Sequence, residues 1–273
     1  MSLPPVAGST EGAADRPSLG AVLDGTALLK GMTVIMTGAT GGIGRHVTRL
    51  LATCGAKVAI VDLSEAAVSA LTSELADSGA EVIGGSVDVA NGEEFREFHR
   101  RVRIELGAVD GLVNCAGLWE PKRFQDVSAH DLSTMLTANV GTAFTACQTV
   151  LPEMIAHGRG SVVNFASTAG EYGSISPAAH YAAAKGAVIG MTKSLAREAS
   201  PHNVRVNAIS PGPTDTIALG AATPEQKASV GARTLFDRLG DPDEIAAGCI
   251  FLLSPLSTFV TGHVLGVNGG SLL

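Results

Sequence analysis

The chain has 273 residues, which is enough for one large or two small domains with a sizeable buried core. Apolar residues make up 45% and charged residues 16%, a composition typical of a globular chain rather than a disordered one. The formal net charge of −7 argues against a nucleic-acid-binding surface. The one basic cluster, "HRRVR" at residues 99–103, is predicted to lie on the solvated face of a helix.

The sequence also limits where the protein acts. No apolar run approaches the roughly 20 residues that cross a bilayer, so we expect no membrane association. The first residues lack the basic region and the compact apolar core of a signal peptide, so we expect a cytoplasmic protein. Because no cysteines show CxxC spacing, we expect buried free thiols and no metal site. The cysteines are Cys54, Cys115, Cys147 and Cys249.

Residues 1–28 are rich in Pro, Gly, Ala and Ser without periodicity, which predicts a flexible extension. Beyond them, short β-branched runs alternate with longer segments of helical spacing. This alternation predicts βαβ units and a parallel sheet that is covered on both faces. No linker marks a second domain, so residues 29–273 are predicted to form one domain. The predicted strands lie within residues 33–38, 57–62, 81–89, 109–117, 160–167, 204–212 and 263–270.

A glycine-rich stretch, "TVIMTGATGGIGRHV", leads from the first predicted strand into the first predicted helix. Glycine lets a backbone approach a pyrophosphate closely, and the N-terminus of a helix favours negative charge. In an open α/β sheet this turn lies at the carboxyl end of the strand, where ligands bind. The spacing is G-x-x-x-G-x-G rather than G-x-G-x-x-G. The predicted phosphate-binding glycines are Gly38, Gly41, Gly42 and Gly44.

Asp62 ends the second predicted strand, 18 residues after Gly44 and near the roughly 20 expected for a ribose-binding acid. A carboxylate there accepts hydrogen bonds from both ribose hydroxyls and repels a 2′-phosphate. The neighbouring residues Thr40, Gly41 and Leu63 supply no cation to offset that repulsion. The sequence therefore favours NAD over NADP. Asp62 is also compatible with a less favoured role, as the N-cap of the next helix, "DLSEAA".

Tyr181 and Lys185 occur four residues apart in a predicted helix over residues 176–198, so their side chains share one face. A phenol with a pKa near 10 is a poor acid–base catalyst at neutral pH. A nearby ammonium group is expected to lower that pKa, so that the tyrosine can take a proton from an alcohol as hydride leaves its carbon.

Six motifs then occur in a characteristic order: "TGATGGIG", Asp62, "NCAG", "NFAS", "YAAAK" and "PGPTDT". Together they resemble the short-chain dehydrogenase/reductase family over residues 30–273, with the YxxxK pair at 181–185. The resemblance implies a three-layer α/β/α Rossmann-type fold with a doubly wound seven-stranded parallel sheet of order 3-2-1-4-5-6-7. It also implies a homotetramer assembled through helices near residues 139–157 and 180–199.

The same resemblance implies the catalytic residues. Tyr181 is the acid–base group, Lys185 tunes it and holds the cofactor ribose, and Asn139 holds a water of a proton relay. The catalytic serine usually precedes the tyrosine by about 13 residues, a count that reaches Thr168. The strand "VVNFASTAG" instead aligns Ser167 with the catalytic serine and implies one extra residue in the following loop. We choose Ser167, with Thr168 as the alternative.

Further cofactor contacts follow from the family pattern. They include Thr40 and Ile43, beside the turn glycines, and Leu63, which follows Asp62. Asp88 and Val89 would lie at the adenine, and Pro211, Gly212, Thr214 and Thr216 at the nicotinamide. The turn "NCAG" contributes Asn114, Ala116 and Gly117, with Cys115 where asparagine is commoner. Trp119, Thr168 and Tyr172 are predicted to line the substrate pocket, and residues 216–234 are predicted to form a lid.

The sequence thus predicts an NAD(H)-dependent oxidoreductase that interconverts a small-molecule secondary alcohol and its ketone. One alternative is an NADPH-dependent 3-oxoacyl-thioester (acyl carrier protein) reductase, which Asp62 disfavours. A non-enzyme alternative is a dinucleotide-binding regulatory protein. A lyase or epimerase using the same site is a further possibility. The apolar character of the loops predicts a neutral, partly apolar substrate.

Overall fold

A computed structural model describes residues 28–216 and 222–271 of the chain. One seven-stranded sheet runs through it in the order β3-β2-β1-β4-β5-β6-β7, and every neighbouring pair is parallel. The predicted fold and strand order are therefore confirmed. The strands are β1 Thr33–Thr37, β2 Lys57–Asp62, β3 Val82–Ser86, β4 Val109–Asn114, β5 Gly160–Phe165, β6 Val204–Pro211 and β7 Val264–Val267.

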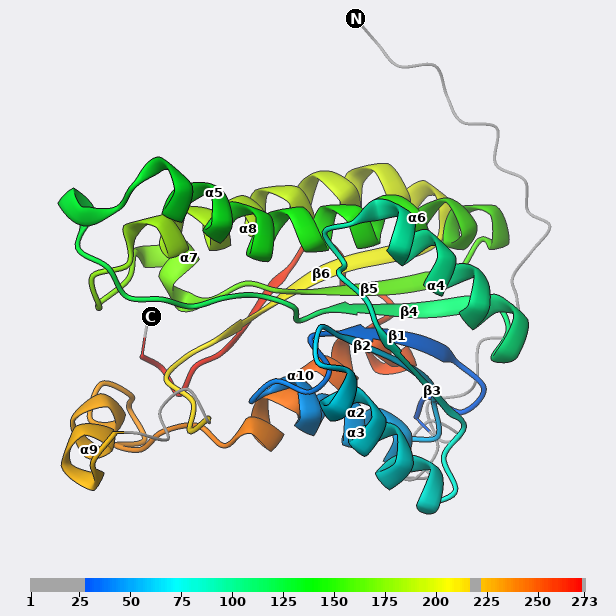
Figure 1. Ribbon diagram of the computed structural model, residues 1–273, viewed down its shortest axis with the longest axis horizontal. Helices are drawn as coiled ribbons and strands as arrows, with labels where there is room; N and C mark the ends of the chain where they lie inside the picture. Colours follow the sequence, from blue (N-terminus) through cyan, green and yellow to red (C-terminus); the bar gives the residue numbers. More distant parts are fainter. Residues whose placement is uncertain (1–27, 217–221, 272–273) are drawn as a thin grey trace, which may run out of the picture.

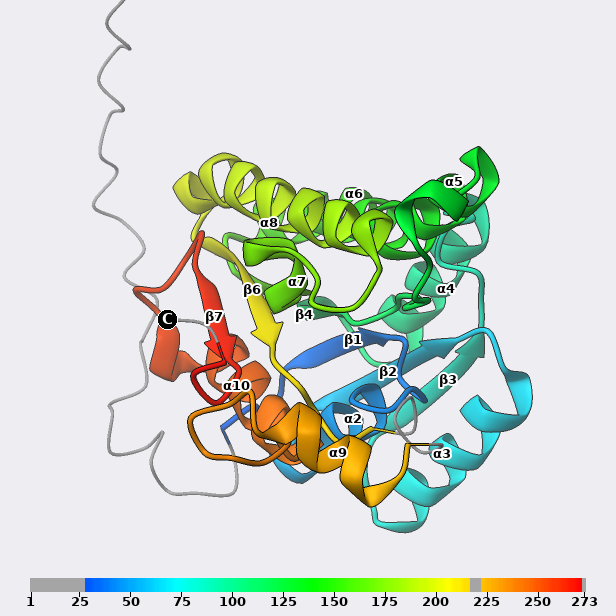
Figure 2. The ribbon, with the colours of Figure 1, turned by 90° about the vertical axis from the view of Figure 1, so that its left-hand side faces the viewer.

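Helices cover both faces of this sheet, as Figures 1 and 2 show. One face carries α2 Gly44–Thr53, α3 Glu65–Asp77 and α10 Pro242–Leu253. The opposite face carries α4 Gly92–Glu105, α6 Thr142–His157 and α8 Ala179–Ala199. The remaining helices are α5 Ala129–Leu136, α7 Thr168–Tyr172, α9 Pro224–Gly231, a π-helical turn at Thr137–Gly141, and 3₁₀ turns at Phe124–Asp126, Ser200–His202 and Pro255–Ser257.

The strands are apolar along their whole length because alternate side chains pack into two different cores. In β1, Val34 and Met36 pack with α2 and α10, whereas Ile35 packs with α4 and α6. All five residues of β1 are buried, as expected for a central strand of a parallel sheet. The sheet therefore separates two apolar cores, and its carboxyl-terminal edge is left for polar residues.

Local signals explain where several helices begin. Ser64, Asn91, Ser128 and Asp241 each accept a hydrogen bond from a backbone N–H in the first turn of the helix that follows. By contrast, Ile43, the residue that precedes α2, provides no side-chain cap. The first backbone N–H groups of α2 are thus free of side-chain partners at the end of the glycine-rich turn.

The basic cluster at residues 99–103 does not lie entirely on the solvated helix face that the sequence predicts. His99 packs between α4 and α6, where its Nε2 lies 2.7 Å from a carboxylate oxygen of Glu153. Their side chains are only 11% and 9% exposed, and Arg103 lies 3.2 Å from the other carboxylate oxygen. A helical repeat places His99 and Arg103 one turn apart, on the side of α4 that faces α6. The solvated-face prediction is therefore wrong for His99.

Three further predictions concern the cysteines, the lid and the N-terminal extension. The cysteines are free, and all but the half-buried Cys115 are buried. Of the predicted lid, residues 224–231 form α9, and residues 217–221 lie outside the described residues. The predicted extension lies outside them too, except for Leu28, which packs against the core. Within the described ranges, no helix is long and apolar enough to cross a membrane.

Candidate functional site

Four predicted catalytic residues come together beyond the carboxyl ends of β4 and β5. Ser167 follows β5 and caps α7, where its hydroxyl accepts a hydrogen bond from the Ala169 N–H at 3.2 Å. Tyr181 and Lys185 lie one turn apart on α8, and the Lys185 Nζ is 5.8 Å from the centre of the Tyr181 ring. The Ser167 side chain lies near enough to the Tyr181 phenol to lower its pKa. This proximity favours Ser167 over Thr168 as the substrate-oxygen donor.

Burial dominates the electrostatics of this pair. It raises the pKa of Tyr181, although the hydrogen bond with Ser167 acts in the opposite direction. Burial also lowers the pKa of Lys185 to about 8. The expected lowering of the tyrosine pKa by lysine is therefore wrong for the protein alone. The reason is that both groups lie in a medium where their charged forms are poorly solvated.

Lys185 and Asn139 converge on Gly117. The Lys185 ammonium donates to the carbonyl of Phe165, the last residue of β5, at 2.8 Å. This hydrogen bond fixes the direction of the lysine side chain. A Cβ at Gly117 would lie 2.6 Å from Asn139 Oδ1 and 3.5 Å from Lys185 Nζ. Only a glycine leaves this space open.

Asn139 belongs to the π-helical turn between α5 and α6. Its amide NH₂ donates to the Leu118 carbonyl at 2.9 Å and to the Met135 carbonyl at 3.0 Å. Its buried Oδ1 finds no partner among the described residues. The extra residue of a π-turn re-aims this side chain toward Gly117 instead of along the helix. The free oxygen suits a hydrogen-bond donor from outside the chain, such as a relay water.

The glycine-rich turn has the shape of a phosphate cradle. Gly38 has a φ of +64°, and a Cβ there would lie 2.6 Å from the Ala116 N. A Cβ at Gly44 would lie 1.9 Å from the Gly38 carbonyl oxygen. Glycine is therefore required at both ends of the turn. Together with the uncapped start of α2, the cradle fits a dinucleotide pyrophosphate. Gly41, Gly42 and Ile43 complete the same turn.

Asp62 lies beside this cradle at the end of β2. One of its carboxylate oxygens accepts hydrogen bonds from the N–H of Thr40 at 2.9 Å and from its hydroxyl at 2.6 Å. The other oxygen accepts from the Leu63 N–H at 2.8 Å. Asp62 also precedes Ser64, the residue that actually caps α3, so the alternative N-cap role is excluded. The carboxylate is held rigidly at the edge of the cradle.

Sequence reasoning missed one cation at this place. The Arg45 guanidinium donates to the Thr40 carbonyl at 2.9 Å, so a positive charge lies against the turn that holds Asp62. The signal was available, because Arg45 directly follows Gly44 and begins the first turn of α2.

Other predicted cofactor residues lie at or just beyond the ends of β3 and β4. Asp88 is exposed after β3, and Val89 beside it is buried. The Asn114 amide donates to Asn164 Oδ1 at 2.8 Å inside the sheet, so any effect of its side chain on a cofactor is indirect. The Ala116 N–H donates to the Thr37 hydroxyl at 3.2 Å, which holds the "NCAG" turn against β1.

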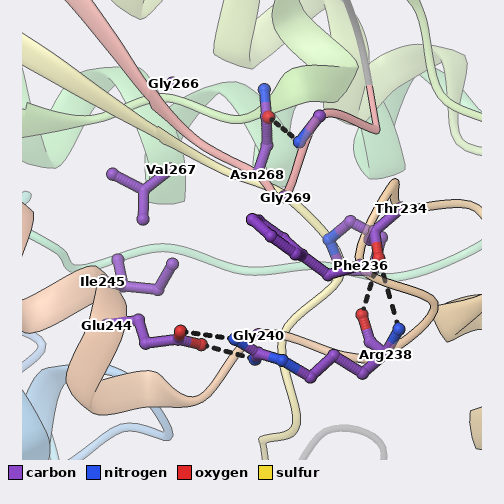
Figure 3. A pocket seen from close by; sticks show the side chains of 12 residues that line it. Thr234, Phe236, Arg238, Gly240, Glu244, Ile245, Gly266, Val267, Asn268 and Gly269 are labelled. Atoms are coloured by element: carbon purple, nitrogen blue, oxygen red, sulfur yellow. Dashed lines mark hydrogen bonds and ion pairs between the residues drawn. The ribbon is translucent and has the colours of Figure 1, made fainter.

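Beyond β6, the Pro211–Thr216 segment is held by the end of β7. The Gly212 N–H donates to the Val267 carbonyl at 3.1 Å, and Thr214 Oγ1 donates to the Gly212 carbonyl at 2.9 Å. A hollow of about 300 Å³ lies next to Pro213 and is closed on one side by the paired Arg238 and Glu244 (Figure 3). The predicted catalytic residues do not line this hollow. We therefore do not assign this hollow to the catalytic site.

Two of the predicted pocket residues are exposed aromatic side chains. Trp119 follows β4 and is 44% exposed, and Tyr172 ends α7 and is 61% exposed. Thr168 begins α7 next to Ser167. Tyr172 borders a hollow that none of the predicted catalytic residues lines, so its place in the substrate pocket stays a prediction.

Comparisons with known proteins identify the architecture. Residues 38–271 match the family model described as "Enoyl-(Acyl carrier protein) reductase". The 3-oxoacyl-(acyl-carrier-protein) reductase FabG of Vibrio cholerae is 37% identical over 242 residues, which cover 89% of this chain and 98% of that protein. The 2-(S)-hydroxypropyl-CoM dehydrogenase 3 of Xanthobacter autotrophicus is 34% identical and covers 89% of this chain and 97% of its own.

The chain belongs to the short-chain dehydrogenase/reductase family. A solved member, 7α-hydroxysteroid dehydrogenase in complex with NADH and 7-oxo glycochenodeoxycholic acid, has a TM-score of 0.84 and 34% identity. The alignment covers 89% of this chain and 94% of that one. As a short-chain dehydrogenase/reductase, the protein is an oxidoreductase of the class that binds nicotinamide dinucleotides.

Proposed function

We propose that the protein is an NAD(H)-dependent oxidoreductase that interconverts a secondary alcohol and its ketone. The observation that carries this proposal is the convergence of Ser167, Tyr181 and Lys185, with Asn139 behind them, at the carboxyl ends of the strands. Ligands of open α/β sheets bind along this edge, near the point where the strand order reverses between β1 and β4.

Each of these side chains has one part in the reaction. A bound nicotinamide dinucleotide supplies the hydride acceptor. Ser167 donates a hydrogen bond to the substrate oxygen and stabilises charge that develops there. Tyr181 takes the hydroxyl proton in oxidation and returns it in reduction. Lys185 stabilises the phenolate, and the free Oδ1 of Asn139 holds the water through which the proton reaches solvent.

Asp62 supports NAD rather than NADP as the cofactor. Its carboxylate is oriented by the two hydrogen bonds from Thr40, so its negative charge remains at the ribose edge of the cradle. A 2′-phosphate placed there would be repelled. The Arg45 guanidinium does not reverse this preference, because its hydrogen bonds are made to the Thr40 and Gly41 carbonyls.

A second candidate is an NADPH-dependent 3-oxoacyl-thioester reductase. Several relatives, among them the Vibrio cholerae protein, are named 3-oxoacyl-(acyl-carrier-protein) reductases, and these names favour this candidate. The exposed Trp119 and Tyr172 instead suit a neutral, partly apolar substrate. A dinucleotide-binding regulator would not need the catalytic set, and a lyase or epimerase would form product without net change of cofactor.

Initial rates with NAD and NADP, measured over cyclic alcohols, diols, hydroxyacyl thioesters and steroids, separate these candidates. We expect kcat/KM with NAD to exceed that with NADP by at least about tenfold, a difference of about 1.4 kcal/mol. Asp62→Ala should lower the NAD preference by a similar factor. The control Asp77→Ala removes an exposed acid at the end of α3 and should leave the ratio of the two cofactors unchanged. Equal or better turnover with NADPH in the unmodified protein would contradict the proposal.

The assembly is proposed on separate grounds. Small exposed residues follow one side of α8, including Ala183, Ala187 and Gly190, and would allow close packing of a second copy. They support a homotetramer built through α6 and α8. A continuous sheet and two cores on its faces support one domain over residues 29–273.

A further inference from the structure

Glu171 lies on α7, the short helix that Ser167 caps. The N-terminus of α7 and the position of Ser167 are locked together, because the Gly170 N–H donates to the Ser167 carbonyl at 2.8 Å. Gly170 also brings α7 into close contact with α8, since a Cβ there would lie 2.5 Å from the Lys185 carbonyl carbon. Figure 2 shows α7 between α8 and β6. Any displacement of α7 therefore displaces Ser167.

The segment from Ala166 to Glu171, which contains Ser167 and most of α7, is tied to β6 at two points. The Ala166 N–H donates to the Ile209 carbonyl at 2.9 Å, just before Ser167. Beyond Ser167, the hydroxyl of Ser210 donates to the carboxylate of Glu171. Ser210 is completely buried, so this hydroxyl is held in one place. The two ties lie on either side of Ser167 and end on adjacent residues of β6.

The carboxylate of Glu171 suits this tie because it is not itself trapped in the interior. Glu171 is exposed and borders a hollow of about 620 Å³ together with Tyr172, Lys193 and His263. One oxygen accepts the buried hydroxyl, and the rest of the group remains hydrated. The tie therefore avoids the cost of burying an unpaired charge.

We propose that Glu171 is a positioning residue, which through Ser210 fixes α7, and with it Ser167, relative to the end of β6. This proposal rests on the proposed function, because it assigns Ser167 the hydrogen bond to the substrate oxygen. The end of β6 leads into Pro211 and Gly212, the segment predicted to cover the nicotinamide. The tie thus sets the distance between the oxygen-binding hydroxyl and the hydride-transfer position. Such distances need to be held within about 0.5 Å.

Four variants test the tie: Glu171→Ala, Glu171→Gln, Ser210→Ala and the Glu171→Ala/Ser210→Ala double variant. Each alanine variant should lower kcat by about tenfold or more, because a 1 Å misplacement can cost about 100-fold. The Kd for NADH should stay within twofold. Glu171→Gln keeps a hydrogen-bond acceptor and should retain most of kcat. The double variant should be no slower than the slower single variant, because both changes break one interaction.

Glu198→Ala is the matched control, because it removes an exposed glutamate from α8 and should leave kcat unchanged. A loss of stability alone would lower the melting temperature without the kcat loss and without rescue by glutamine. The proposal is overturned if both single alanine variants keep kcat within twofold, or if their effects multiply in the double variant. The absence of any turnover by the unmodified protein would instead defeat the proposed function, and the positioning role with it.

Discussion

Tyr181, which is half-buried, and Lys185, which is buried, have to change or hold charge during proton transfer. Burial raises the pKa of the phenol and lowers the pKa of the ammonium to about 8. Each charged form alone is therefore disfavoured, whereas a phenolate and an ammonium side by side compensate each other. The Phe165 carbonyl helps Lys185 to keep its proton by accepting a hydrogen bond from it. The lysine consequently acts as a local counterion for the phenolate.

Replacement of Tyr181 by phenylalanine tests the proton-transfer role directly. We expect kcat for alcohol oxidation to fall by at least about 100-fold, the usual contribution of a positioned acid–base group. The Kd for NADH, measured by fluorescence titration, should remain within a few-fold, because the ring is retained. The chain has only two tyrosines, so Tyr172→Phe is the matched control and should change kcat far less. Oxidation by Tyr181→Phe at a rate within a few-fold of the unmodified protein would exclude Tyr181 as the base.

The turn between β1 and α2 gives a sharp test of cofactor binding. In Gly44→Ala the added methyl group would meet the Gly38 carbonyl oxygen at 1.9 Å, so the cradle has to open. We expect the Kd for NADH to rise by more than about tenfold, or about 1.4 kcal/mol. Gly190→Ala is the control, because a Cβ there meets nothing within 4 Å. It should bind NADH normally. Unchanged NADH affinity in Gly44→Ala would show that the pyrophosphate binds elsewhere.

The contact between α4 and α6 predicts a pH dependence of stability. Burial lowers the pKa of His99, and this effect outweighs the attraction of Glu153; Arg103 also lowers it. The unfolded chain therefore binds more protons at this residue than the folded chain below about pH 6.5. It follows that the free energy of unfolding falls as the pH drops through that value toward the lower folded pKa.

Urea unfolding at pH 7.5 and pH 5.5, at one protein concentration, checks this expectation. The unmodified protein should lose more stability between the two pH values than His99→Gln, which cannot take up a proton. His157→Gln is a useful control, because His157 is exposed at the end of α6. It should retain the dependence of the unmodified protein. Equal losses in the unmodified protein and His99→Gln would show that other groups carry the pH dependence.

Local patterns in the sequence were sufficient for the sheet and for the glycine turn. Continuous β-branched runs predict buried parallel strands, and the strand order came with the family motifs. Long-range pairings left no such signal: Glu171 and Ser210 are 39 residues apart, and His99 meets Glu153 only because α4 packs on α6. The π-turn at Asn139 was not predicted, because no residue type specifies the insertion. The pKa of Tyr181 was predicted in the wrong direction, because the extent of burial depends on tertiary packing.

The whole sheet connects the two halves of the site. The glycine cradle and Asp62 belong to β1 and β2, and the catalytic residues follow β4 and β5, on the other side of β1. Both groups face the same edge because all the strands are parallel. The two apolar cores pack on opposite faces of this one sheet, so neither half can unfold without exposing the core residues of the other.

Thermal unfolding tests this coupling, and Trp119 is a built-in probe for it. Trp119 is the only tryptophan, it lies beside the proposed site, and it is 44% exposed. Its fluorescence and the far-UV circular dichroism of the helices should give the same midpoint if residues 29–273 unfold as one unit. NADH at 100 times its Kd adds about 2.7 kcal/mol. At about 2–4 °C per kcal/mol, this should raise both midpoints by roughly 5–10 °C.

Gly44→Ala serves as the control for this shift, because a Kd about tenfold higher leaves about 1.4 kcal/mol at the same NADH concentration and should halve the shift. A shift of the Trp119 signal without a shift of the circular dichroism would contradict the single unit. It would mean that the loops after β4 respond to the cofactor while the sheet does not. A common shift would show that cofactor binding stabilises the sheet as a whole. This is expected because neighbouring parallel strands fix both the cradle and the catalytic residues.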